Sequence, residues 1–476
     1  LLVKHFDLSR FDALYLTLPL CVGFLLLWLA ALELPAAPAL RGWTAAIYVL
    51  HPWCIVLVRG GARVVGLTGL LVDNSLGHYG AVVLLSALLA LPFAFYRPAK
   101  ADPRGRAWIE VDAAALRHNL SALSALLPEG GKLMPVVKAN AYGHGDLEVA
   151  RICAGEGVRA FAVATAAEGV RLRRGGVRRT ILVLGCTGPG EVPLLARYRL
   201  TQAVVSAGHA RALDAQGRRI AVHLKIDTGL HRLGIPWDDV EDLVAPFACR
   251  NLKITGVFTH LSDAEALDGA SQARTREQLR RLQSAVEGLR KAGFDPGAVH
   301  FQGSYGLLNY SDCGLLSAYA RPGIALYGVL SLPEHRTRAA VELRPVLSLR
   351  ARVTQLHRLE PGEAAGYDGA FTARRPTVLA TLAIGYADGW PRSLSNGTGR
   401  VLIHGQLAPV AGLVCMDQLL VDVTDVDGVS PGDVATLIGR DGPAEVTAGQ
   451  AAQAAGTITN ELLSRLGPRL PRIVLE

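Results

Sequence analysis

A single lysine, Lys138, stands between a short apolar run and a loop bounded by glycines, in the string Met134-Pro-Val-Val-Lys-Ala-Asn-Ala-Tyr-Gly-His-Gly145. The run predicts a short buried strand, and the glycines predict a turn that lets the backbone approach a ligand closely. A primary amine at a strand end, desolvated by its neighbours, can lose its proton and form an imine with an aldehyde. The pattern therefore indicates a reactive amine, against the alternative of a surface lysine beside an ordinary turn.

The elements that must position this amine alternate along the chain. Strand-like runs recur at 136–138, 161–165, 181–185, 203–206, 222–227, 254–260 and 299–304, separated by helix-like stretches. This alternation is typical of α/β proteins, and we expect a parallel (β/α)8 barrel over 104–333. Reacting groups in such a barrel lie at the carboxyl ends of strands, where Lys138, His260 and Ser304 fall. After residue 333, short strand-like segments with Gly and Pro turns predict a β-rich C-terminal domain over 334–476.

The first hundred residues are more apolar than the rest of the chain. The run at 14–34 is long enough to cross a hydrocarbon core of about 30 Å, and shorter runs follow at 43–58 and 79–96. We expect residues 1–103 to form an all-α transmembrane segment that precedes the barrel. The alternative is a buried helical bundle in a soluble domain.

Composition excludes other classes of partner. The formal charge of +8 is spread along the chain without a block of like charges, so we expect no nucleic-acid partner. The seven cysteines show no CxxC pair and no His/Cys ligand spacing, so we expect no metal site.

Three strings together resemble the motifs of the alanine racemase family of pyridoxal-phosphate enzymes. They are the string around Lys138, Arg321-Pro-Gly-Ile-Ala-Leu-Tyr-Gly328 and Ile384-Gly-Tyr-Ala-Asp-Gly389, and the resemblance extends over 106–476. It implies pyridoxal 5'-phosphate as the cofactor and an amino acid as the substrate. It also implies that Lys138 and Tyr386 exchange the α-proton on opposite faces of the substrate, because racemisation needs two acid/base groups.

The resemblance implies roles for further residues that bind the cofactor. Arg321 faces the pyridine nitrogen, and His260 hydrogen-bonds this arginine. Arg232 assists the phenolic oxygen and the substrate carboxylate, and Lys225 matches a lysine that is carbamylated in some relatives, although an unmodified lysine is an equal alternative here. The phosphate contacts are Tyr142, Ser304 and the backbone amides of Gly323 and Ile324.

The same resemblance implies a homodimer with shared sites, because Tyr386 and the backbone amide of Met416 come from the partner subunit in this family. Asn460 stands where alanine racemases usually have a tyrosine. A carboxamide there leaves room beside the substrate's β-carbon and can hydrogen-bond a hydroxyl. This substitution, like the apolar N-terminal segment, resembles the membrane serine racemases of vancomycin-resistance type.

The N-terminal segment adds a second resemblance. The string Tyr48-Val-Leu-His-Pro-Trp53 is similar to a late helix of the acyltransferase-like membrane domain of those enzymes, so residues 1–103 would be the end of such a domain. This implies a multi-pass protein of the cell membrane. Because pyridoxal phosphate and free amino acids are cytosolic, we place the catalytic part in the cytoplasm.

We therefore expect an amino-acid racemase that interconverts L- and D-serine, L- and D-alanine or both, and supplies a D-amino acid for peptidoglycan precursors. Two alternatives stay open. One is a strict alanine racemase tethered to the membrane, and the other is a non-catalytic membrane sensor of amino acids.

Overall fold

The computed structural model describes residues 38–95, 102 and 104–476. The chain divides into two compact units, residues 1–102 and 103–476. In the first unit, α3 (Pro38–Val64) packs against α5 (Ser75–Phe95), with the short α4 (Thr68–Leu71) between them in the chain. Small side chains such as Cys54 and Ala90 are buried in this unit, whereas Trp53 is 70% exposed.

The predicted transmembrane segment and membrane location are wrong for these helices. Within the described part of the chain, no helix combines the length and the apolar character needed to cross a bilayer. The apolar run of α3 is bounded by Arg41 and Arg59, and that of α5 lies between His78 and Pro92, so both fall short of about 20 residues. The predicted multi-pass location, with a cytoplasmic catalytic part, loses its basis with them. The run at 14–34 lies outside the described residues.

A parallel sheet forms the centre of the first part of the second unit. Its strands follow the order β3-β4-β5-β6-β8-β9, and the short β7 pairs with β6. Nearly all their apolar residues are buried, as expected for strands covered on both faces. The strands are β3 (Ala160–Val163), β4 (Thr180–Val183), β5 (Thr201–Val204), β6 (Ile220–Asp227), β7 (Ile235–Pro236), β8 (Leu252–Phe258) and β9 (Ala298–His300).

This sheet is barrel-like but is not one continuous eight-stranded sheet. The strands β2 (Lys132–Leu133) and β10 (Tyr319–Ala320) form a separate parallel pair. Backbone hydrogen bonds from Val137 to Ala162 (2.9 Å) and from Ala318 to Val299 (2.8 Å) join the pair to β3 and β9. The N–H of Val136 donates to the carbonyl of Pro322 at 2.9 Å beyond the two short strands, but Pro322 has no N–H to donate in return. The expected regular (β/α)8 barrel is corrected to this interrupted form.

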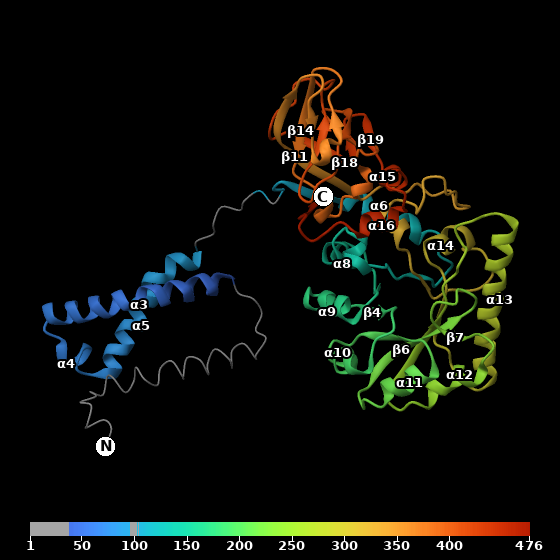
Figure 1. The fold of residues 1–476 in the computed structure, drawn as a ribbon. Helices are drawn as coiled ribbons and strands as arrows, with labels where there is room; N and C mark the ends of the chain where they lie inside the picture. Colours follow the sequence, from blue (N-terminus) through green and yellow to red (C-terminus); the bar gives the residue numbers. More distant parts are fainter. Residues whose placement is uncertain (1–37, 96–101, 103) are drawn as a thin grey trace. The chain divides into compact units, whose positions relative to one another are not determined.

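Helices surround the parallel strands (Figure 1). Several begin with a side-chain cap, as where Thr165 and Glu168 form a capping box at α9. The helices are α6 (Ala113–Ser124), α8 (Asp146–Gly155), α9 (Ala166–Arg174), α10 (Val192–Arg197), α11 (Ala207–Asp214), α12 (Val240–Val244), α13 (Gly269–Lys291) and α14 (Ser304–Tyr310).

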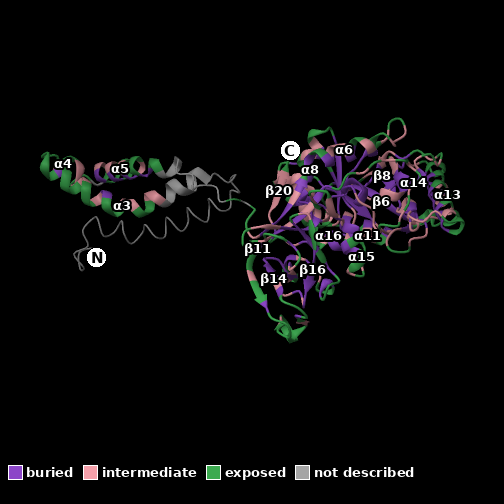
Figure 2. Ribbon diagram, turned by 90° about the horizontal axis from the view of Figure 1, so that it is seen from above, coloured by how far each residue is buried: buried purple, intermediate pink, exposed green. Residues whose placement is uncertain are grey.

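The C-terminal part is a β-rich layer with two short helices. Its sheet has the order β19-β18-β15-β16-β17-β14-β11-β1-β20, and β18 also pairs with β11, which closes a ring of strands. The elements are β11 (Leu347–Leu359), β12 (Ala364–Ala365), β13 (Phe371–Thr372), β14 (Thr377–Leu382), β15 (Arg400–Ile403), β16 (Gln406–Ala411), β17 (Leu419–Asp422), β18 (Val434–Asp441), β19 (Ala444–Val446), α15 (Ala448–Ala454), α16 (Thr459–Ser464) and β20 (Arg472–Leu475). Within the second unit, buried residues concentrate in the parallel sheet and in this C-terminal sheet (Figure 2).

The first strand of the second unit, β1 (Ala107–Asp112), lies in this C-terminal sheet. It pairs antiparallel with β11 and parallel with β20. The segment that was expected to open the barrel domain at residue 104 thus contributes its strand to the other layer. Two segments far apart in the sequence are joined by main-chain hydrogen bonds in this way.

A buried ion pair holds the start of β1 against a turn in the C-terminal part. Asp388 is fully buried in the 3₁₀ turn η5 (Tyr386–Asp388). Its Oδ1 accepts a hydrogen bond from Arg106 Nη2 at 2.5 Å, and its Oδ2 accepts one from Arg106 Nη1 at 3.0 Å. The amide of Gly385 donates to the same carboxylate at 3.0 Å, and Arg469 Nε lies 3.4 Å from it. This bidentate pair fixes the turn that contains Tyr386.

We expect Arg106→Met to lower the free energy of unfolding of the second unit by up to about 3 kcal/mol, because it leaves the buried carboxylate of Asp388 with Arg469, at 3.4 Å, as its remaining cationic partner. Urea denaturation of the purified chain measures the loss. The matched control is Arg375→Met, which breaks an exposed ion pair with Asp425 and should change stability little. Equal losses in the two variants would contradict the assignment of a structural role to the Asp388 pair.

Candidate functional site

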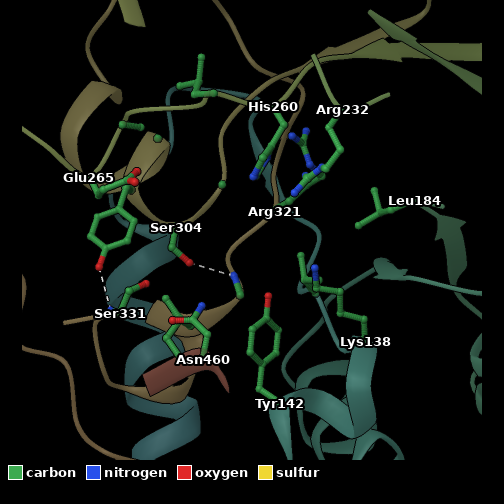
Figure 3. A pocket seen from close by; sticks show the side chains of 18 of the residues that line it. Lys138, Tyr142, Leu184, Arg232, His260, Glu265, Ser304, Arg321, Ser331 and Asn460 are labelled. Carbon is green, nitrogen blue, oxygen red and sulfur yellow. Dashed lines mark hydrogen bonds between the residues drawn. The ribbon is translucent and has the colours of Figure 1, made fainter. Parts of the chain in front are cut away.

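A cavity of about 570 Å³ opens at the carboxyl ends of the parallel strands. It brings together most of the residues that the sequence singled out, and Figure 3 shows several of them facing a common space. The predicted residues that line it are Lys138, Tyr142, Lys225, Arg232, His260, Ser304, Arg321, Gly323, Ile324 and Asn460. Residues that line it without having been singled out include Leu184, Glu265, Tyr305, Ser331 and His335.

Lys138 begins a left-handed turn, α7 (Lys138–Tyr142). Residues 139–142 have φ between 51° and 54°, a conformation that costs roughly 1–2 kcal/mol per residue for side chains other than glycine. Glu168 Oε1 accepts the N–H of Ala139 at 2.8 Å, and Asn140 Oδ1 accepts the N–H of Asp146 at 3.0 Å. These bonds hold a strained turn that directs both Lys138 and Tyr142 into the cavity.

The surroundings of Lys138 favour its neutral amine. Burial lowers the pKa of Lys138, and the nearby charge of Arg232 lowers it further, while Glu168 opposes the shift. Its Nζ lies 6.0 Å from the ring centroid of Tyr142. A lysine with a lowered pKa has a larger fraction of nucleophilic amine at neutral pH.

Arg321 is buried at the base of the cavity and is held by a chain of two histidines. Its Nη1 donates to His300 Nδ1, and its Nη2 donates to the carbonyls of Thr259 (2.6 Å) and Phe301 (3.2 Å). Since Nδ1 accepts, the proton of His300 is on Nε2, which lies 2.9 Å from His223 Nδ1. Burial lowers the pKa of Arg321 to about 9.

The hydrogen bond expected between His260 and Arg321 is replaced by the bond to His300. No hydrogen bond within the described residues joins His260 to Arg321, although His260 lines the same cavity. Sequence reasoning missed His300 and His223. Each follows a valine in a strand-like run and is buried, and a buried polar side chain requires a partner, which was the available signal.

Two further basic residues line the cavity, Lys225 in β6 and Arg232 in the loop that follows β6. Burial, then the charges of Arg321 and Arg232, lowers the pKa of Lys225 to about 7, while Asp227 opposes the shift. Its Nζ lies 5.0 Å from the ring centroid of Phe258. The amine therefore titrates near neutral pH, whereas an exposed lysine stays fully charged.

Ser304, Gly323 and Tyr142 make a small polar cradle. Ser304 Oγ accepts the amides of Gly323 (3.0 Å) and Ala325 (3.2 Å). A Cβ at Gly323 would lie 2.5 Å from Tyr142 Oη, so only glycine leaves room for this hydroxyl. Burial raises the pKa of Tyr142 to about 12, which keeps its hydroxyl protonated and able to donate to an anion.

Asn460, in the first turn of α16, lies across the cavity from Arg232 and Arg321 (Figure 3). Its Oδ1 is buried and has no hydrogen-bond partner within the described part of the chain. A buried amide oxygen without a partner is costly, so it is an available acceptor for a ligand.

Tyr386 and Met416 lie elsewhere on the second unit. Their side chains are 43% and 54% exposed, and neither lines the cavity of Lys138 within the described residues. Backbone bonds pin the two segments together, from Tyr386 N to Cys415 O (3.0 Å) and from Ala387 N to Met416 O (2.9 Å). The chain thus presents a tyrosine and a methionine on a fixed, exposed turn.

A fold of parallel strands followed by a β-rich layer, with a reactive lysine and a buried arginine in one cavity, defines a class of pyridoxal-phosphate isomerases. Models of the alanine racemase N-terminal and C-terminal domains match residues 111–331 and 346–474. The chain belongs to the alanine racemase family, whose enzymes depend on pyridoxal phosphate. The family, the racemase activity and the cofactor predicted from the sequence are confirmed.

The chain is similar to several proteins named as racemases. It is 39% identical to an amino-acid racemase of Enterococcus faecalis, over 99% of this chain and 67% of the relative, and 36% identical to a serine/alanine racemase of Enterococcus gallinarum, over 98% and 66%. It therefore spans about two thirds of the length of these relatives. It is 42% identical to an alanine racemase of Geobacter sp. (strain M21), over 77% of this chain and 97% of the relative.

Solved structures show the same fold. The alanine racemase from Bacillus anthracis with bound L-Ala-P superposes with a TM-score of 0.73 at 30% sequence identity, over 80% of this chain and 96% of that chain. An alanine racemase from Clostridium difficile 630 superposes with a TM-score of 0.72 at 32% identity, over 78% and 96%.

We expect the second unit to lose stability as the pH falls from about 6.5 to about 4, and His223 to cause part of the loss. Burial, with Arg321 nearby, lowers the pKa of His223 to about 4, so the unfolded chain binds a proton in this window that the folded chain does not. The free energy of unfolding must then decrease as the pH decreases. Urea denaturation across this range should show a slope that His223→Gln reduces by up to about 1.4 kcal/mol per pH unit.

The matched control is His357→Gln, since His357 is exposed and folding does not bury it. An unchanged slope in His223→Gln would show that His223 does not contribute to the acid sensitivity.

Proposed function

We propose that this chain is a homodimeric racemase that accepts serine as well as alanine, with each site completed by the partner subunit. The observation that carries the choice of substrate is the unpartnered buried oxygen of Asn460 in the cavity of Lys138. A site that can hydrogen-bond a substrate hydroxyl can select for it, whereas an apolar pocket rejects it only weakly. The relatives named amino-acid racemase and serine/alanine racemase support this substrate class.

The residues of the cavity fit pyridoxal 5'-phosphate. Lys138 offers an amine with a lowered pKa for covalent attachment. The hydroxyls of Ser304 and Tyr142 and the amide of Ile324 would donate to a phosphate, and the amide of Gly323, which donates to Ser304 Oγ in this structure, would join them when the phosphate replaces that acceptor. When bound, the cofactor supplies an electron-withdrawing ring that stabilises negative charge at the substrate's α-carbon. Arg321 would face the pyridine nitrogen, and its proton, retained up to a pKa of about 9, would keep that nitrogen unprotonated.

We assign the proton transfers to two side chains of this chain. The Nζ of Lys138 would remove or return the α-proton on one face. Tyr386 of a partner subunit would serve the opposite face, where the exposed turn η5 could reach a neighbouring cavity. Arg232 and the backbone amide of Met416 would bind the substrate carboxylate. The D-amino acid formed would serve peptidoglycan precursors.

We also propose that Lys225 can be carbamylated. An amine with a pKa of about 7 is largely neutral at slightly alkaline pH, as attack on CO2 requires. Attack of the neutral amine on CO2 would release one proton to solvent and place a carbamate anion beside Arg232, which would brace that guanidinium for the carboxylate of the substrate.

Subunit complementation tests the shared site. The inactive variants Lys138→Ala and Tyr386→Phe, mixed under conditions that exchange subunits, should recover about a quarter of the parent activity. Half of the dimers would then be mixed, and each would have one complete site of two. Racemisation of L-alanine followed by circular dichroism measures the recovery. Absence of recovery, with exchange verified by mass spectrometry, would place both residues in the same subunit's site.

Racemisation of L-serine and L-alanine by the parent and by Asn460→Tyr tests the substrate. We expect the parent to turn over both, and the variant to lose at least about tenfold in kcat/KM on serine relative to alanine, because a phenol ring fills the space of the hydroxyl group. Alanine turnover alone in the parent, or equal loss on both substrates, would identify a strict alanine racemase. Cofactor binding without exchange of the α-hydrogen in heavy water would identify a sensor.

A further inference from the structure

A chain of hydrogen bonds connects His335 to the segment that contains Asn460. Tyr305 Oη lies 2.6 Å from His335 Nδ1 and accepts the amide of Ser331 at 2.8 Å, a bond drawn in Figure 3. The carbonyl of Ser331 in turn accepts the backbone N–H of Thr459 at 2.9 Å. Ser331, Tyr305 and His335 line the same cavity as Asn460. Ser331 therefore joins the first turn of α16 to Tyr305 in the cavity wall by main-chain hydrogen bonds on both of its sides.

The hydroxyl of Tyr305 lies at the centre of this series of hydrogen bonds. It has one proton, and because it accepts from Ser331 it can donate that proton to His335 Nδ1, which places the imidazole proton on Nε2. Burial raises the pKa of Tyr305, which favours the protonated phenol. The two rings meet edge to face, with centroids 5.3 Å apart. The tyrosine is thereby held by packing as well as by hydrogen bonds.

Asn460 depends on such support because its own carboxamide oxygen is free. Its Oδ1 has no partner within the described residues, so no bond of that oxygen sets where it points. A hydrogen bond weakens steeply with distance and angle, so a small shift of α16 would weaken a bond to a substrate hydroxyl. Alanine has no hydroxyl, and its turnover would tolerate the same shift.

We propose that Tyr305 and His335 are positioning residues that hold Ser331, and through it Asn460, and so set the ratio of serine to alanine turnover. The proposal rests on the function proposed above, in which Asn460 meets the substrate hydroxyl. In this proposal the proton transfers at the α-carbon stay with Lys138 and Tyr386.

The test is Tyr305→Phe in the full chain, assayed on both substrates. The ring stays, but the amide of Ser331 and His335 lose their shared partner. We expect kcat/KM on L-serine to fall about tenfold, the size of one hydrogen bond, and that on L-alanine to change less than about twofold. The affinity for pyridoxal phosphate, measured by absorbance titration, should stay unchanged, which shows that the neighbouring Ser304 is undisturbed.

The matched control is Tyr310→Phe, in the same helix α14. Its hydroxyl is buried and has no hydrogen-bond partner within the described part of the chain, so its removal should leave the serine-to-alanine ratio unchanged. A second control repeats Tyr305→Phe in an Asn460→Ala background. If Tyr305 acts through Asn460, its effect on serine should disappear there.

Equal losses on both substrates in Tyr305→Phe would overturn the inference, and so would an undiminished serine effect in the Asn460→Ala background. The parent chain separates this failure from that of the proposed function. If the parent turns over alanine alone, there is no contact to a substrate hydroxyl, and both proposals are wrong. If the parent is active on serine and Tyr305→Phe leaves the serine-to-alanine ratio unchanged, only the positioning role is wrong.

Discussion

The gathering of positive charge in one cavity is the constraint on which the rest of the catalytic unit depends. Four cationic residues line it, namely Lys138, Lys225, Arg232 and Arg321. Burial and mutual repulsion lower the pKa of both lysines, so the protein bears an electrostatic cost to keep these groups together. The fully buried guanidinium remains tolerable because carbonyls and a neutral imidazole accept its protons. Such a cavity is suited to anions, and a phosphate and a carboxylate bound there would offset the repulsion among these groups.

A second constraint is the rigidity of the turn that contains Tyr386. The buried carboxylate of Asp388 anchors η5 to Arg106, and backbone bonds fasten the same turn to the segment of Met416. Yet the two side chains that a racemase would use here are exposed. A rigid element that presents functional groups to solvent is the arrangement that a site shared between subunits needs, because the geometry is set before the partner arrives.

The sequence predicted the features that depend on local chemistry. Lys138 and its glycine-bounded loop could be recognised from neighbouring residues, and the carboxyl ends of parallel strands converge, so His260 and Ser304 were expected near Lys138. Arg321 was expected there from the family resemblance. The left-handed turn at 139–142 could not be predicted, because alanine and tyrosine disfavour positive φ and distant contacts to Glu168 impose it. The pairing of β1 with β20 and the bond from Arg321 to His300 likewise depend on residues far apart in the sequence.

The N-terminal helices show the opposite error, in which a local pattern was taken too far. Apolar content alone suggested membrane spans, but the runs in α3 and α5 are cut short by charged and helix-bending residues. A hydropathy plot averages the apolar character of residues over a window, whereas a transmembrane helix requires an uninterrupted apolar length. The two criteria therefore give different answers where the apolar runs are short.

The unpaired oxygen of Asn460 explains why serine and alanine would share one site. Alanine has no side-chain donor for this oxygen, which has no hydrogen-bond partner among the described residues, so binding alanine breaks no bond that the structure shows. Serine supplies a hydroxyl donor and gains a hydrogen bond, worth on the order of 1 kcal/mol when the geometry is good. Discrimination then comes from a gain with serine, and no rejection of alanine is needed. The size of that gain depends on how well the carboxamide is held, which places the control of specificity in the wall formed by Ser331 and Tyr305.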